Sequence, residues 1–204
     1  MKALLVVDVQ YDFLPGGSLA VPDGDKVIPV INRIQDKFDI VVATQDWHPK
    51  NHGSFASNHQ GKKAGDFVKL SGEDQILWPD HCVQGTPGAQ IHHDLKRKSW
   101  KKVFQKGTNP VVDSYSGFYD NNRGEDTGLA TYLKEHGVEE VFVTGLAADY
   151  CVKFTVMDAI KEGFETNLVE DATKGVNLSS GDTERAFTEM EKAGAKIIDS
   201  SSIP

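Results

Sequence analysis

The chain has 204 residues, of which 39% are hydrophobic and 25% are charged, proportions typical of a folded globular protein rather than a disordered one. Its 22 basic and 30 acidic residues give a net charge of −8, which argues against nucleic acid as a partner. No apolar stretch is long enough to span a membrane, and two cysteines are too few for a disulfide framework. We therefore expect one domain over residues 1–204, with no membrane partner and a reducing, cytoplasmic location.

The first predicted element is a strand over residues 3–7, a continuous apolar run that suits a parallel sheet covered on both faces. Asp8 follows it directly. Ligands of open α/β sheets bind beyond the carboxyl ends of the strands, so a carboxylate here could take part in chemistry. Capping a helix or ordering a loop explains Asp8 equally well when it is considered alone. A loop rich in Gly, Pro and Asp then leads to a helix with apolar residues at positions 27, 31, 34 and 38.

A second buried strand is expected over residues 40–44, and Asp46 and His48 come shortly after it. In an extended segment, side chains two residues apart project to the same side, and Pro49 biases His48 toward extended geometry. Carboxylate and imidazole groups suit Zn, Fe or Mn, so the pair could be half of a metal site. Without further partners, a chance pairing is the simpler explanation.

Residues 48–80 show little periodicity, so we expect a long loop within a metal- and substrate-binding region over residues 46–101. His81 is a candidate third ligand that this loop would bring back to the first two. Cys82 could compete as a softer ligand, but we prefer a small packed residue because no other cysteine is near it in the sequence. Three protein ligands with open positions are typical of a catalytic or substrate-binding metal site.

A third short strand over residues 102–105 is followed by Lys106, again a polar residue at the end of a strand. A lysine on a loop is normally solvated, and Lys106 alone gives little reason to expect catalysis. An irregular segment over residues 111–124 carries Tyr115. A helix over residues 129–136 then stops at Gly137.

The next strand, over residues 141–144, stops at Gly145, and a turn of small residues leads to Cys151 and a further helix. A cysteine near a helix N-terminus is favoured as the thiolate, and the turn could direct backbone N–H groups at a developing oxyanion. A buried structural thiol is the commoner role for an arbitrary cysteine. Strands over residues 164–169 and 195–198, with a helix over 186–193, complete the chain.

This alternation of strands and helices predicts a three-layer α/β/α fold with a mostly parallel central sheet. It also places four residues, Asp8, Asp46, Lys106 and Cys151, at one edge of that sheet, because each ends or follows a strand. Four polar residues at one edge are less easily explained as independent structural residues than any of them is alone.

Five segments carry a family resemblance: residues 7–13, 46–55, 78–86, 106–107 and 145–152. Together they resemble the isochorismatase-like cysteine hydrolase superfamily, and the metal motifs Asp-x-His and Trp-Pro-x-His are similar to those of its nicotinamidase branch. The resemblance runs from about residue 3 to about residue 198. It implies the isochorismatase-like hydrolase fold.

The resemblance also implies a function and the residues that perform it. Nicotinamide, and also pyrazinamide, would be hydrolysed to the acid and ammonia through a cysteine thioester, in the salvage of NAD. The implied catalytic residues are Asp8, Lys106 and Cys151. The implied oxyanion hole consists of the N–H groups of Ala147 and Cys151, with a cis peptide between Leu146 and Ala147.

One divalent metal ion per chain, Zn first and Fe or Mn otherwise, is implied by the same resemblance, with Asp46, His48 and His81 as its ligands. Some members of the family have an extra protein ligand, and His52, Ser54 or neither could fill that role here. The residues implied at the substrate are Phe13, Trp78 and, as a weaker candidate, Tyr115. Members of the family range from monomers upward, which allows a homo-oligomer.

Two other interpretations remain open at this point. The same fold could act on another amide or carbamoyl compound, or the protein could be a catalytically silent metal- or ligand-binding module. The presence of Asp8, Lys106 and Cys151 together argues against a silent module. A hydrolase that uses metal-bound hydroxide would need a base, and no Glu directly follows His48.

Overall fold

The computed structural model describes residues 1–203 and contains a central sheet of six strands, all paired in parallel. The strand order is β5-β2-β1-β6-β7-β8, so the direction of winding reverses next to β1. The strands of this sheet are β1 (Lys2–Val7), β2 (Ile40–Asp46), β5 (Trp100–Lys106), β6 (Glu140–Leu146), β7 (Glu165–Lys174) and β8 (Lys196–Ile198).

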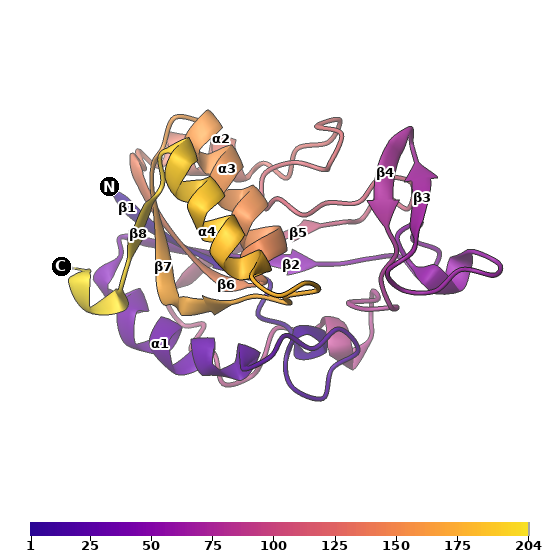
Figure 1. Ribbon diagram of the computed structural model, residues 1–204. Coiled ribbons are helices and arrows are strands. Elements are labelled where there is room, and N and C mark those ends of the chain that lie inside the picture. The colour runs from indigo at the N-terminus through magenta and orange to yellow at the C-terminus, as the bar shows by residue number, and fades with distance from the viewer. Residues whose placement is uncertain (204) are drawn as a thin grey trace.

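Helices cover both faces of the sheet, as Figure 1 shows. Helix α1 (Val27–Ile34) lies on one face, and α2 (Leu129–Glu135), α3 (Lys153–Lys161) and α4 (Asp182–Ala193) lie on the other. Two apolar cores result, one on each side, because alternate residues of β1 and β6 point to opposite faces. The predicted three-layer α/β/α fold with a parallel sheet is confirmed.

The strands extend further than their apolar runs suggest. Strand β2 includes Asp46 and β5 includes Lys106, and these two terminal residues are paired in register. Val7 is paired with Gly145 in the same way. In-register parallel strands end together, so Asp8, Asp46, Lys106 and the turn after β6 lie at one edge of the sheet, as predicted.

Residues 48–80 are not a continuous loop, and here the expectation was wrong. They contain a two-stranded antiparallel hairpin, β3 (Phe67–Leu70) and β4 (Glu73–Ile76), which projects away from the sheet in Figure 1. Most of its side chains are exposed or half-buried, so the alternation of apolar and polar residues that marks a strand is weak. Its turn, Ser71 and Gly72, has positive φ angles of 49° and 92°, as a two-residue hairpin turn requires.

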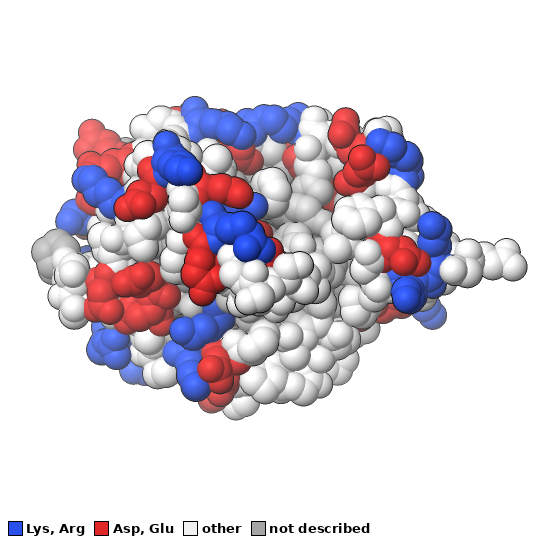
Figure 2. All heavy atoms as spheres, in the orientation of Figure 1, with Lys and Arg blue, Asp and Glu red and all other residues white. Residues whose placement is uncertain are grey.

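Acidic and basic side chains are intermixed over the helical side of the molecule in Figure 2. Between helix α4 and the hairpin the same face carries little charge. Within residues 1–203, every helix is too short or too polar to cross a membrane.

Candidate active site

Lys106 is the centre of the charged cluster at the edge of the sheet. It is buried, although a lysine at the end of a strand would ordinarily be solvated. Its Nζ donates to Asp46 Oδ1 at 2.8 Å, to the Ser114 carbonyl oxygen at 2.7 Å and to Cys151 Sγ at 3.4 Å. These bonds use all the N–H groups of an ammonium. The Asp8 carboxylate is also adjacent, with Oδ2 3.0 Å from Nζ.

The two oxygens of Asp8 differ in their partners. Oδ1 accepts a hydrogen bond of 2.6 Å from Thr44 Oγ1. Oδ2 forms the ion pair with Lys106, but among residues 1–203 it receives no hydrogen bond of acceptable geometry. Because the ammonium donates elsewhere, Oδ2 retains lone pairs that can accept a proton.

Burial dominates the protonation of the nucleophile and its neighbours. Burial raises the pKa of the Cys151 thiol well above its ordinary value, although Lys106 acts in the opposite direction. It raises the pKa of Asp8 as well, again against the effect of Lys106. For Lys106, burial opposes the charge, but Asp46 and Asp8 outweigh it and raise the pKa well above the usual range. The site therefore favours a neutral thiol beside a charged lysine, and not the thiolate expected from a helix N-terminus.

The turn between β6 and α3 has the predicted geometry. The peptide between Leu146 and Ala147 is cis, and Ala148–Val152 forms a π-helical turn that carries Cys151. Gly145 has a φ of 104°, and a Cβ at this position would lie 2.0 Å from the Val7 carbonyl oxygen, so only glycine fits. Ala147 and Cys151 both line the same cavity.

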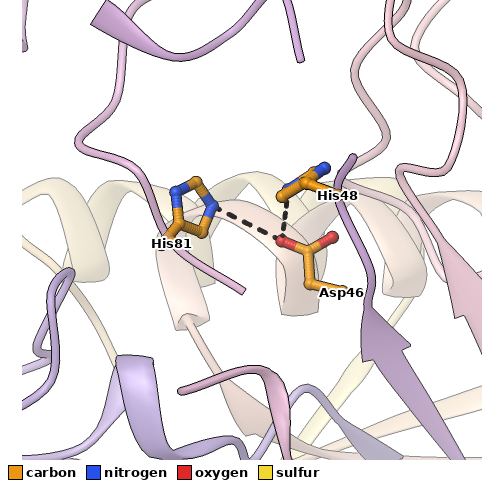
Figure 3. Close-up of side chains that lie close together, drawn as sticks. All are labelled: Asp46, His48 and His81. Atoms are coloured by element: carbon orange, nitrogen blue, oxygen red, sulfur yellow. Dashed lines mark hydrogen bonds and ion pairs between the residues drawn. The ribbon is translucent and has the colours of Figure 1, made fainter. Parts of the chain in front are cut away.

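A buried cluster of potential metal ligands lies next to the nucleophile (Figure 3). Asp46 Oδ2 is 2.9 Å from His48 Nε2 and 3.5 Å from His81 Nε2. Potential ligand atoms of the three residues all lie within 4.8 Å of one another. The Nδ1 atoms donate to backbone carbonyl oxygens, that of His48 to Gly107 at 2.8 Å and that of His81 to Pro79 at 2.7 Å. This leaves both Nε2 atoms directed at the carboxylate, an arrangement that fits a metal ion.

Charge and backbone geometry both support this cluster. Burial opposes ionisation of Asp46, but His48 and Lys106 hold its pKa well below the usual range, so the carboxylate is the stable form. Gly107 has a φ of 65°, and a Cβ there would lie 2.4 Å from His48 Cε1. A glycine is therefore required for the histidine ring to reach its position.

The two candidates for an additional ligand bind each other. His52 Nδ1 and Ser54 Oγ are 2.7 Å apart, and both side chains are buried. His52 Nε2 has no hydrogen-bond partner among residues 1–203, and its ring centroid lies 4.3 Å from that of His48. Cys82 is buried in the core on the α1 side, and its N–H donates to Asp12 Oδ2 at 2.7 Å, which agrees with a packed thiol.

Phe13, Trp78 and Tyr115, the residues expected at the substrate, line one cavity together with Cys151, Asp46 and His81. Trp78 Nε1 donates to the Tyr115 hydroxyl at 3.2 Å, and the Trp78 ring meets Tyr150 edge-on with centroids 4.9 Å apart. The structure therefore brings every predicted site residue to one cavity or to its immediate border. The remaining lining residues were not predicted: Leu19, Asp113, Tyr150 and Val176.

Comparison with known proteins identifies the family of the chain. A sequence model described as the isochorismatase domain matches residues 2–202. The chain belongs to the isochorismatase family. It is 50% identical over 200 residues to a protein named nicotinamidase from Escherichia coli strain K12, with 96% of this chain and 93% of the relative covered.

Solved structures give the same result. A structure titled nicotinamidase pyrazinamidase from Acinetobacter baumannii superposes with a TM-score of 0.96 at 46% identity, covering 100% of this chain and 98% of the other. A structure titled pyrazinamidase of Pyrococcus horikoshii in complex with zinc superposes with a TM-score of 0.80 at 43% identity, covering 97% and 98%.

Proposed function

We propose that the protein is a nicotinamidase, which hydrolyses nicotinamide to nicotinate and ammonia through a thioester on Cys151. The single observation that carries this proposal is the grouping of the Cys151 thiol, which lines the cavity, with the buried Lys106 and the Asp8 carboxylate, beside a cluster of metal ligands. The similarity to relatives named nicotinamidase supports the same substrate.

The first half of the reaction uses Asp8 as the base. Its Oδ2 accepts the thiol proton while Sγ attacks the carboxamide carbon, so that a C–S bond forms and the carbonyl oxygen becomes an oxyanion. The N–H groups of Ala147 and Cys151 would donate to that oxyanion. When the C–N bond breaks, Asp8 returns its proton to the departing amine, which leaves as ammonia.

The second half repeats the proton transfers with water. Water attacks the thioester carbon and Asp8 accepts its proton. The C–S bond then breaks and the proton returns to sulfur, which restores the thiol and releases nicotinic acid. The carboxyl group of this product loses the second proton of the water to solvent and becomes nicotinate. The ammonium of Lys106, 3.4 Å from Sγ, stabilises the negative charge on sulfur whenever it forms.

Asp46, His48 and His81 would hold one divalent ion. Zinc is the first candidate, because a relative is described in complex with zinc, and Fe or Mn suits the same ligands. Bound there, such an ion supplies an electron-pair acceptor for the pyridine nitrogen of the substrate. Phe13 and Trp78 would flank the ring and orient its carboxamide toward Cys151.

We also propose that residues 46–101 are the metal- and substrate-binding region of a single domain, because they contribute Asp46, Trp78 and His81 to the cavity. Pyrazinamide carries the same carboxamide and a ring nitrogen, so we propose it as a second substrate. Two relatives are named for both activities.

The test is release of ammonia from nicotinamide by the purified protein. The Cys151→Ala variant should abolish turnover, and appreciable residual activity would exclude covalent catalysis by this residue. Benzamide, which lacks the ring nitrogen, should be a much poorer substrate than nicotinamide. Equal rates for the two amides would remove the proposed role of the metal ligands in positioning the substrate.

A further inference from the structure

Gln75 is an exception within the exposed β3–β4 hairpin. Its side chain is 5% exposed, whereas every other residue of the hairpin is half-buried or exposed. The two N–H groups of its Nε2 are shared among three acceptors: the Ile76 carbonyl oxygen at 2.8 Å, Asp113 Oδ2 at 2.9 Å and the Tyr115 hydroxyl oxygen at 3.0 Å. A buried amide with these partners ties the hairpin to the segment 113–115.

The segment 113–115 forms a wall of the catalytic cavity and is held from both sides. From inside the site, Lys106 Nζ donates to the Ser114 carbonyl oxygen. From outside, Gln75 binds the two residues that flank Ser114. The Tyr115 hydroxyl oxygen lies within hydrogen-bonding distance of N–H groups of both Gln75 and Trp78. Trp78, like Tyr115, lines the catalytic cavity.

Tyr115 separates a small space from two larger ones. The catalytic cavity has a volume of about 380 Å³. Two outer cavities that Tyr115 also lines have volumes of about 790 Å³ and 1440 Å³. The position of Tyr115 therefore sets how much room the catalytic cavity leaves for an aromatic ring. Tyr115 has open space behind it into which it can move.

We propose that Gln75 is a positioning residue that sets the place of the Tyr115 wall and thereby the fit of the aromatic ring of the substrate. This inference rests on the proposed function, because it assumes an aromatic amide in the cavity. Among residues 1–203, Gln75 forms no hydrogen bond with Cys151 or with the metal ligands. We therefore expect it to affect the binding of the substrate's aromatic ring and not the chemical step. The hydrogen bond from Lys106 to the Ser114 carbonyl oxygen does not involve Gln75, so we expect the catalytic groups to stay in place when Gln75 is replaced.

The experiment compares Gln75→Ala with Glu73→Ala, a matched change at an exposed residue of the same strand. Steady-state kinetics with nicotinamide should show a KM about tenfold higher in Gln75→Ala and a kcat within about twofold of wild type. The Gln75→Ala change should reduce kcat/KM less for a ring-methylated nicotinamide than for nicotinamide, because a Tyr115 wall that is held less firmly admits a larger ring. Glu73→Ala should match the wild type with both substrates.

A double-variant cycle separates positioning from a general loss of structure. In a Tyr115→Phe background, which lacks the hydroxyl that Gln75 binds, Gln75→Ala should raise KM by clearly less than it does alone. Equal effects in both backgrounds, an unchanged KM, or matching losses in Glu73→Ala would overturn the proposal. Turnover of nicotinamide by the wild type tests the proposed function separately. Failure of the Gln75 proposal can therefore be distinguished from failure of the proposed function.

Discussion

Asp8→Asn tests the base directly, because it retains the size of the side chain and removes its ability to accept the thiol proton. Burial raises the pKa of the Cys151 thiol, which favours its neutral form, and among residues 1–203 Oδ2 of Asp8 accepts no hydrogen bond. General-base catalysis contributes about 10² to 10⁴-fold in rate, equivalent to about 2.7 to 5.4 kcal/mol of barrier. We therefore expect kcat/KM for nicotinamide to fall by that factor, in an assay of released ammonia.

The pH profile provides a second measurement on the same residue. The base must be unprotonated to act, and burial raises the pKa of Asp8 above its usual value of 3.8. In the wild type, kcat/KM should therefore fall as the pH is lowered through this raised pKa, so the acid limb lies at higher pH than for an ordinary aspartate. Asp36→Asn, at an exposed position, is the control and should leave rate and profile unchanged. Turnover of Asp8→Asn within about tenfold of wild type would refute the assignment of Asp8 as the base.

Three further changes probe the surroundings of the nucleophile. Lys106→Met leaves the buried carboxylates of Asp8 and Asp46 without their cation, and should destabilise the fold by about 3–5 kcal/mol in denaturant unfolding as well as abolish turnover. His81→Ala should reduce the metal bound per chain, measured by elemental analysis, and raise KM for nicotinamide; full metal content would contradict its role as a ligand. Asp149→Ala removes the carboxylate that accepts the N–H groups of Val176 and Asn177 at 2.9 and 2.7 Å. Because Val176 lines the cavity, kcat/KM should fall about tenfold, and an unchanged value would show that this loop does not shape the site.

The sheet and the catalytic edge could be predicted because the signals involved are local. Residues 3–7 and 141–143 are apolar without interruption, a pattern typical of a strand that is covered on both faces. Once those strands are parallel, the position of their ends follows from topology. This is why Asp8, Asp46 and Lys106 could be placed together although 98 residues of sequence separate the first from the last.

The parts that could not be predicted depend on contacts distant in the sequence. Gln75 lies in a hairpin whose exposed residues give no period, and its partners Asp113 and Tyr115 are about 40 residues away. Leu19 and Val176 reach the cavity from loops on either side of it, and an apolar residue in a loop carries no chemical signal. The raised pKa of Cys151 could not be predicted either, because its largest cause is burial, which depends on the assembled fold.

Lys106 connects the nucleophile and the metal ligands into one electrostatic unit. Its ammonium lies within 3.0 Å of the carboxylates of both Asp8 and Asp46 and also donates to Cys151 Sγ. A positive ion held by Asp46 would partly neutralise that carboxylate. The positive charge of Lys106 would then act more strongly on Asp8 and on the sulfur of Cys151. Binding at the metal ligands would then lower the pKa values of the base and of the thiol together. One buried lysine between two carboxylates would thus couple the positioning of the substrate to the activation of the nucleophile.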